Sequence, residues 1–285
     1  MRRLGRMAPI WQESAWSFPD RTLVMLSKEW HIGREEHFMK RLSMQRTYGF
    51  ARRELVVVIF VLVALFVLCI PALKRARQRS WVICCNCNMK ELGTAYRLWA
   101  GDHGNQVPSM APLTNGGWKE LLTNSNVGPS CWTNYVVMAD YVGRAPAVLV
   151  CPNDERRPAK DFGASFTNNS TVSYFVGVNA NDAYPQSIAG GDRNLGPGTV
   201  PRPDYGYSPA NGQGNDVIIN GPVCWSLKMH SGGNASGFGN ILLGDGSAQQ
   251  VSSASFNMDW LRNAQDAATT PAGATNGYGI RLLFP

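Results

Sequence analysis

Apolar and polar positions divide the chain into an apolar helix, an amphipathic helix and a region of short strands. Leu55–Ile70 is an unbroken run of apolar side chains without a charge. Counted through Leu73, the run has about 19 residues, close to the roughly 20 that span a bilayer's hydrocarbon core as a helix. Lipid offers no partners for open backbone groups, so a helix is the expected form. The pattern therefore predicts one transmembrane helix.

The helix is expected to continue past this run, because apolar residues recur at helical spacing. Steps of three or four residues place one stripe of side chains along a helix, here Val82, Cys85, Met89, Leu92, Tyr96 and Trp99. Pro71 can kink such a helix without ending it, whereas Gly101 and the polar residues 102–105 provide a stop. One helix from Phe50 to about Ala100 is predicted, with its first half in lipid and its second half under a globular head.

The region 105–285 is rich in Gly, Asn, Pro and Ser, and its short apolar segments are typical of strands. The predicted strands are Ala147–Val150, Val172–Val178, Val217–Ile219, Val223–Leu227, Asn240–Leu243 and Ser247–Val251, and the predicted short helices are Trp118–Leu122, Trp132–Val142 and Phe256–Ala264. Gly244-Asp245-Gly246 is a strong hairpin signal between the last two strands. Turn residues dominate 186–216, which is predicted to be loop. An antiparallel sheet laid on the second half of the helix accommodates these segments, so the fold class is α+β.

Charge is concentrated around the apolar run. Residues 1–79 hold 15 Lys and Arg against 6 Asp and Glu, whereas 80–285 hold 12 against 14. The formal net charge of the chain is +7. The excess basic residues therefore flank the predicted membrane helix, where their side chains can meet anionic lipid head groups. The head is close to neutral, so the charge does not indicate nucleic-acid binding.

The start of the apolar run resembles the class III signal of type IV pilins and type II secretion pseudopilins. Gly49 precedes Phe50, Glu54 is the fifth residue counted from Phe50, and Pro71 is the twenty-second. The resemblance implies cleavage by a prepilin peptidase between Gly49 and Phe50, and N-methylation of Phe50. It also implies that the Phe50 amine of one subunit pairs with Glu54 of a neighbour. Such pairing neutralises a carboxylate that would otherwise be costly in lipid.

Further segments resemble a pseudopilin-like subgroup. They are Asn88–Gly93 with Tyr96–Ala100, Val148–Asp154, and His230–Gly233 with Gly239–Ser247, which carries the C-terminal motif His230, Asp245 and Gly246. The resemblance runs in patches from Gly49 to about Val251. It implies a pilin-like fold and an inner-membrane, single-pass protein with its head in the periplasm or outside the cell. The implied partners are the prepilin peptidase, an inner-membrane assembly platform with its ATPase, and other pilins or pseudopilins.

These features predict four regions of the chain. Residues 1–49 form a leader, 50–73 the transmembrane helix, 74–104 the soluble half of the long helix, and 105–285 the β-rich head. Residues 1–38 are expected to precede a true start at Met39 or Met44, the alternative being a genuine cytoplasmic extension. A secretory signal peptide is an alternative for 40–73, but basic residues follow instead of a small-x-small cleavage site.

Seven cysteines raise the question of metals and disulfides. Cys69 lies in the apolar run, where a thiol is a small hydrophobe. Cys84-x-x-Cys87 lacks the second ligand pair of a structural zinc site, so no metal is predicted. The other six are expected to be structural and some to form disulfides, without a preferred pairing: Cys84, Cys85, Cys87, Cys131, Cys151 and Cys224.

No motif indicates catalysis or a cofactor. His230 and Asp245 lack a nucleophile motif, and Asp245 between two glycines suits a tight turn. Calcium is weakly supported, because no Asp-x-Asp-x-Asp-Gly loop occurs. We therefore expect neither an enzyme nor a cofactor. Exposed aromatic residues offer a glycan-binding face as an alternative to core packing; they are Trp118, Trp132, Tyr205, Tyr207 and Trp225.

Two functions are weighed. The first is a structural subunit of a pilus or type II secretion pseudopilus. The alternative is an uncleaved, membrane-anchored binding module whose head recognises an extracellular ligand such as a glycan. Arg52 and Arg53 favour the alternative, because the proteins that this signal resembles are usually uncharged there.

Overall fold

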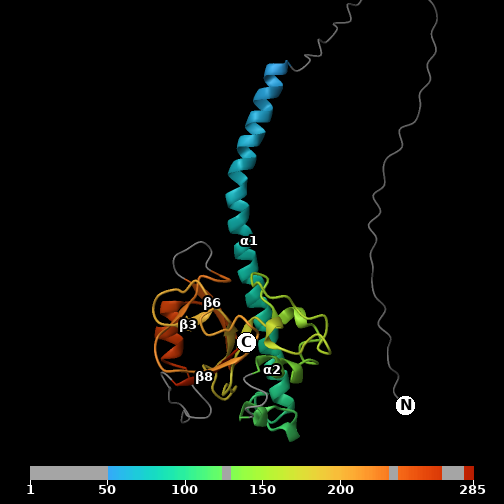
Figure 1. Cartoon of the computed structure of the whole chain (residues 1–285), viewed down its shortest axis with the longest axis vertical. Coiled ribbons are helices and arrows are strands. Elements are labelled where there is room, and N and C mark those ends of the chain that lie inside the picture. The colour runs from blue at the N-terminus through green and yellow to red at the C-terminus, as the bar shows by residue number, and fades with distance from the viewer. Residues whose placement is uncertain (1–50, 124–129, 231–236, 265–278) are drawn as a thin grey trace, which may run out of the picture. The chain divides into compact units, whose positions relative to one another are not determined.

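One long helix dominates the computed structural model, which describes residues 51–123, 130–230, 237–264 and 279–285. Helix α1 (Arg52–Asp102) runs for 51 residues and includes Pro71 (Figure 1). The long helix predicted to end near Ala100 is therefore confirmed over its described part. Gly49 and Phe50, the predicted cleavage site, lie outside the described residues.

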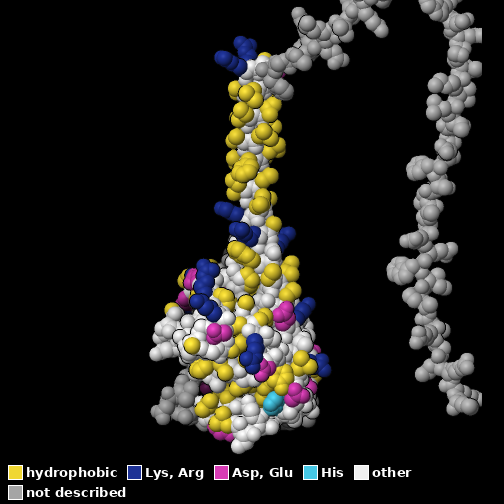
Figure 2. All heavy atoms as spheres, turned by 90° about the vertical axis from the view of Figure 1, so that its right-hand side faces the viewer, with side chains coloured by type: hydrophobic (Ala, Val, Ile, Leu, Met, Phe, Trp, Pro, Cys, Tyr) yellow, Lys and Arg dark blue, Asp and Glu magenta, His cyan; other side chains and the backbone are white. Residues whose placement is uncertain are grey.

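The first half of α1 exposes its apolar side chains. Every residue of Leu55–Ile70 is exposed, and Phe60 and Phe66 keep 72% and 73% of their surface accessible. Figure 2 shows this apolar column with Lys and Arg at both of its ends. Among the described helices, α1 alone is long and apolar enough to cross a membrane, and its apolar window is not buried by the protein.

The second half of α1 is amphipathic and packs into the head. The six positions of the predicted stripe are all buried, as the 3.6-residue period requires. Leu98, which lies off the stripe, is 55% exposed. The stripe thus fixes which face of the helix the head covers.

The described part of the head contains two antiparallel sheets. Within the described residues the strands are β1 (Tyr174–Gly177), β2 (Ile188–Asp192), β3 (Leu195–Pro197), β4 (Asn215–Ile219), β5 (Val223–Trp225), β6 (Phe238–Leu243), β7 (Ala248–Ser252) and β8 (Ile280–Phe284). Six of them form one sheet in the order β4-β8-β1-β2-β6-β7, and β3 pairs with β5. The predicted antiparallel sheet, and with it the α+β class, is confirmed.

The remaining elements are short and helical. They are η1 (Leu113–Asn115), η2 (Lys119–Thr123), α2 (Cys131–Val137), η3 (Pro146–Leu149), η4 (Asn169–Thr171), α3 (Ser253–Ser255) and η5 (Phe256–Leu261). Short helices were predicted where η2, α2 and η5 lie. The strand predicted at Ala147–Val150 is wrong, because Pro146 opens a 3-10 turn there, with its φ already suited to a helical start.

Alternating residues of the sheet enter two separate cores. Tyr174 and Val176 of β1 pack on the side of α1 and α2, whereas Phe175 packs on the other side. The same alternation sends Leu242 to the helix side and Ile241 and Leu243 away from it. Successive side chains of a strand point to opposite faces. The sheet is therefore covered on both sides, with β3, β5 and η5 contributing to the layer opposite α1.

The segment 186–216, predicted to be loop, contains the central strand β2, the strand β3 and the start of β4. Two adjacent glycines, a residue type common in turns, lie inside β2. A Cβ on Gly191 would lie 2.4 Å from Cζ of Phe175, and one on Gly190 would lie 2.9 Å from the Phe175 carbonyl oxygen. These glycines permit close approach inside the sheet and do not mark a turn.

The predicted hairpin forms, and its turn lies against α1. Strands β6 and β7 pair from Phe238 with Ser252 to Leu242 with Ala248. Asp245 accepts a hydrogen bond from the Ser247 amide at 2.8 Å, as turn aspartates do. The Asp245 carbonyl accepts from Nη1 of Arg97 at 3.4 Å. Two of the sequence patches that resemble pseudopilins therefore meet between helix and hairpin.

Candidate functional site

A buried polar cluster joins four distant parts of the chain. Cys85 comes from the buried stripe of α1, Cys151 follows η3, Asp192 ends β2, and His230 follows β5. None of the four exposes more than 1% of its surface. Buried polar groups are normally satisfied by one another, so these side chains form one unit. We call it the Cys-His cluster.

Short distances connect the members of the Cys-His cluster. Cys85 Sγ donates to Asp192 Oδ1 at 3.1 Å. His230 Nε2 lies 3.1 Å from Asp192 Oδ2 and 3.6 Å from Cys151 Sγ. Asp192 Oδ2 also accepts hydrogen bonds from the Asn240 backbone amide at 2.6 Å and its side-chain amide at 2.9 Å. Asp192 is thus held in place from β6.

Burial and charge move the pKa values of the cluster. Burial raises the pKa of the Cys85 thiol, and the charge of Asp192 adds to the effect. Burial alone would lower the pKa of His230, but the adjacent Asp192 carboxylate outweighs it and raises that pKa to about 10. For Cys151, the hydrogen bond with Cys85 outweighs burial, and His230 adds to it, so the pKa falls to about 7. Both contacts of His230 are made by Nε2, whereas its buried Nδ1 has no hydrogen-bond partner among the described residues.

The backbone before His230 is held in an unusual conformation. Met229 has φ 62°, in the left-handed region that costs an ordinary residue about 1 kcal/mol or more. Such strain persists where the surroundings determine the conformation. Here it accompanies the entry of His230 into the cluster, and Asn194 secures the same segment by donating to the Lys228 carbonyl at 2.9 Å.

A second buried polar unit lies three residues beyond Cys151. Asp154 receives two hydrogen bonds from Arg193, both at 2.7 Å, and the two side chains expose 0% and 4% of their surface. Ser173 donates to Asp154 at 2.6 Å and Tyr205 at 3.2 Å. The Arg193 guanidinium also lies 3.4 Å from the Tyr205 ring centre. This Asp154–Arg193 pair joins residues 151–154, here called the Cys-Pro segment, to the end of β2, beside the Cys-His cluster.

The residues that the sequence singled out do not lie together in the structure. Glu54 is exposed in the first turn of α1, and Pro71 lies within its exposed part. Asp245 stays at its turn, whereas His230 contacts a different carboxylate, Asp192. The C-terminal motif therefore does not form one site. Sequence reasoning missed Asp192, because it stands beside glycines in a segment predicted to be loop.

The cysteines differ in environment, and all seven are free thiols in the structure. Cys84 and Cys87 are exposed on α1 on either side of Cys85. Cys131 is buried and donates to the Leu283 carbonyl at 2.8 Å, and Cys224 donates to Ser253 Oγ at 3.2 Å. Spacing along the sequence singled out Cys84 and Cys87, whereas the fold selects Cys85 and Cys151.

Two of the five aromatic residues considered as an alternative glycan-binding face are buried. Trp118 and Trp225 are buried, with 1% and 0% of their surface exposed, so the expectation of an exposed face is wrong for them. Trp132, Tyr205 and Tyr207 are partly buried. Core packing is the common role of such residues.

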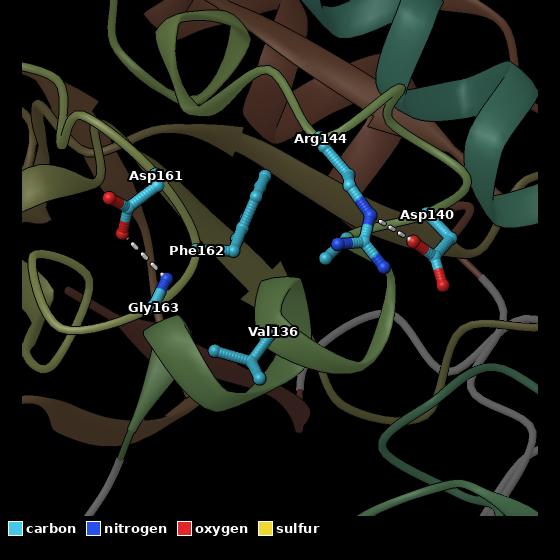
Figure 3. Close-up of a pocket in the computed structure, with 7 residues that line it drawn as sticks. Val136, Asp140, Arg144, Asp161, Phe162 and Gly163 are labelled. Atoms are coloured by element: carbon cyan, nitrogen blue, oxygen red, sulfur yellow. Dashed lines mark hydrogen bonds and ion pairs between the residues drawn. The ribbon is translucent and has the colours of Figure 1, made fainter.

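A shallow surface hollow beside α2 is the other candidate. Figure 3 shows Arg144 turned toward Asp140, and the Asp161 carboxylate directed at the Gly163 amide. The Arg144–Asp140 pair is 79% and 72% exposed, so water screens it. The acidic groups of the hollow are engaged within their own segments, and the Cys-His cluster remains the stronger candidate.

Comparison of the chain with protein-family models, with curated proteins and with solved structures returned no match. The function proposed below rests on the residues of this chain.

Proposed function

We propose that the protein is a pseudopilin-like structural subunit, cleaved by a prepilin peptidase and assembled into a pilus or a type II secretion pseudopilus. The observation that carries the proposal is the division of α1. Its first half exposes an unbroken apolar surface, and one face of its second half is buried against an antiparallel sheet. One continuous helix thus provides a membrane anchor, a packing surface for other subunits and a support for the head.

The exposed apolar half needs a partner. Burial of apolar surface is worth about 25 cal/mol per Å², and exposed apolar patches of this extent mark membrane or protein contacts. Lipid covers such a helix before assembly, and the helices of neighbouring subunits cover it in a filament. The basic side chains at both ends of the column suit the head-group regions of a bilayer (Figure 2).

Glu54 supports the assembly step. Its carboxylate accepts a hydrogen bond from the Ala51 amide at 3.2 Å, so it lies at the N-terminus of α1, where the helix dipole favours a negative charge. In the proposed filament, the N-terminal amine of a neighbour's Phe50 neutralises this carboxylate when lipid or protein surrounds it. The other partners are the assembly platform and its ATPase in the inner membrane.

Processing predicts a defined mature N-terminus. Mass spectrometry of protein from native membranes is expected to find N-methyl-phenylalanine at Phe50 as the first residue. A Gly49→Val variant, whose larger side chain blocks peptidase access, is expected to keep its leader. An intact leader on the wild-type protein would contradict the proposal and favour the uncleaved anchored module, which Arg52 and Arg53 suggested.

Assembly is expected to depend on Glu54. Removal of one partner of a buried charge pair costs about 2 kcal/mol or more, so Glu54→Gln is expected to lower the incorporation of subunits into filaments about tenfold or more. The measurement is the ratio of sheared filament protein to membrane protein. Glu91→Gln, an exposed substitution in the second half of α1, is the matched control. Equal incorporation of both variants would contradict the pairing.

A further inference from the structure

We propose that Cys85, Cys151 and His230 bind a zinc ion, with Asp192 as the fourth ligand. The site is independent of filament assembly, because it lies wholly within the head and the buried half of α1. It also replaces the expectation, drawn from the Cys84-x-x-Cys87 spacing, that the cysteines have no role in metal binding. Spacing along one helix could not reveal ligands that come from four distant parts of the chain.

The distances suit a tetrahedral zinc site. The two sulfur atoms and the His230 ring nitrogen all lie within 4.8 Å of one another. Zinc bonds of about 2.3 Å to sulfur and 2.0 Å to nitrogen, at tetrahedral angles, separate a sulfur from a nitrogen ligand by about 3.5 Å. Cys151 Sγ and His230 Nε2 are 3.6 Å apart. Little movement is needed for these ligands to receive an ion.

Asp192 becomes the fourth ligand after a shift of its carboxylate, because no single Asp192 oxygen lies within 4.8 Å of all three other ligand atoms. Its two carboxylate oxygens already lie 3.1 Å from Cys85 Sγ and 3.1 Å from His230 Nε2, in contacts that a bound cation would replace. Four protein ligands close the coordination sphere, which is the arrangement of structural zinc sites; catalytic sites keep a position open. The complete burial of all four side chains also favours a structural ion over a catalytic one.

The donor atoms select the class of metal. Two sulfurs and one imidazole nitrogen suit zinc or another thiophilic transition ion, whereas calcium and magnesium prefer oxygen ligands. A single carboxylate is an accepted zinc ligand beside thiolates. Zinc binding displaces the protons of both thiols and of His230 Nε2, because thiolates and a neutral imidazole nitrogen are the ligands.

The residues around the cluster hold the ligands in position. Asn240 donates twice to Asp192, and the Tyr174 hydroxyl lies 3.3 Å from Cys85 Sγ. Asn88 in turn donates to the Tyr174 hydroxyl at 3.5 Å and to the Val150 carbonyl, next to Cys151, at 3.3 Å. Partners of this kind orient metal ligands and are part of a formed site. The ion would tie α1 to the strand layer and to the Cys-Pro segment at one point.

A disulfide between Cys85 and Cys151 is the competing use of the two thiols. It would bring the sulfur atoms to about 2.05 Å and would leave His230 and Asp192 as a buried pair with no further purpose. Zinc engages all four side chains. The observations therefore favour the ion, and the disulfide becomes an outcome of the test.

The test uses the full chain, purified in detergent and reduced. After incubation with one equivalent of Zn²⁺ and gel filtration, mass spectrometry of the metal content is expected to find one zinc per chain. Cys85→Ser, Cys151→Ser and His230→Gln are expected to lose at least nine-tenths of it. Cys84→Ser and Cys87→Ser are matched controls, because these exposed thiols flank Cys85 on the same helix. They are expected to retain the full amount.

Buried substitutions can also unfold the head, so two further measurements accompany the variants. Cys131→Ser removes a buried thiol outside the cluster and is expected to keep its zinc. X-ray absorption at the zinc edge of the wild-type protein is expected to show two sulfur neighbours and two lighter ones. That spectrum requires no variant.

Four results would overturn the proposal. They are failure of the folded, reduced wild-type chain to retain zinc, retention of zinc by both Cys85→Ser and Cys151→Ser, a spectrum without sulfur neighbours, and a Cys85–Cys151 disulfide in protein taken from native membranes. The first three exclude the ligand set directly. The last shows that the two thiols are used in a different way.

Discussion

Replacement of Asp154 by asparagine is expected to lower the free energy of unfolding of the head by about 3 to 5 kcal/mol, because it leaves a buried charge without its partner. Arg193 loses the carboxylate that receives both of its 2.7 Å hydrogen bonds, and only 4% of the Arg193 side chain is exposed to water. Tyr205, which stacks on the guanidinium, cannot supply the missing charge. Chemical denaturation of the full chain in detergent, followed by tryptophan fluorescence, measures the change.

Asp140→Asn is the matched control. Asp140 pairs with Arg144 at 2.6 Å, but the side chains are 72% and 79% exposed. An exposed pair of this kind contributes at most about 1 kcal/mol. The two carboxylates therefore have similar partners and opposite degrees of burial. A loss below about 1 kcal/mol for Asp154→Asn, or equal losses for both variants, would contradict the role given to the buried pair.

The same carboxylate predicts a loss of stability in acid. Burial raises the pKa of Asp154, but the hydrogen bonds and charge of Arg193 outweigh burial, so the net pKa lies below the ordinary 3.8. The unfolded chain then binds this proton first as the pH falls. The stabilisation is complete above about pH 5 and is lost from about pH 4 downward. Melting temperatures measured from pH 6 to pH 3 are expected to fall less steeply for Asp154→Asn than for the wild type.

Both buried units depend on one short segment. Cys151 enters the Cys-His cluster, and Asp154, three residues later, pairs with Arg193. Asp192 and Arg193 are likewise neighbours at the end of β2 and contribute to the two units in turn. The Cys-Pro segment and the end of β2 are therefore connected at two points, by the Cys-His cluster and by the Asp154–Arg193 pair. This arrangement gives a physical reason for the Cys-Pro-Asn-Asp patch that the resemblance singled out.

The long helix could be predicted because two independent patterns point to it. The uniform apolar run and the stripe from Val82 to Trp99 each indicate a helix, and neither depends on residues elsewhere. The β6–β7 hairpin was predictable for the same local reason, since its Gly-Asp-Gly turn directly follows the apolar strand β6.

Elements that depend on distant contacts could not be predicted. The two glycines of β2 serve the close approach of Phe175, which is not visible in the segment itself. Strand β8 pairs with β1 and β4, from which it is separated by long stretches of chain. The Cys-His cluster is the extreme case, because its four members come from positions 85, 151, 192 and 230. No local spacing relates them.

Gly93 shows how closely the helix and the hairpin approach, and Gly93→Ala is expected to destabilise the head by about 2 to 3 kcal/mol through overpacking. A Cβ at this position would lie 2.2 Å from the Gly246 carbonyl oxygen and 2.9 Å from Cδ1 of Leu242. The first contact is with backbone at a turn where Gly246 has φ 81°, so it cannot be relieved by a side-chain rotation. Alanine improves helix propensity by about 1 kcal/mol, and the predicted loss is net of that gain.

Gly101→Ala provides the opposite expectation within the same helix. A Cβ on Gly101 meets no atom within 4 Å, so only the propensity term acts, and stability is expected to rise by up to about 1 kcal/mol. Denaturation of both variants in parallel therefore separates close packing from helix propensity. If Gly93→Ala were neutral or stabilising, α1 and the turn at Gly246 would have to lie farther apart than the structure places them. The resemblance between Asn88–Gly93 and the pseudopilin-like subgroup would then need a reason other than this contact.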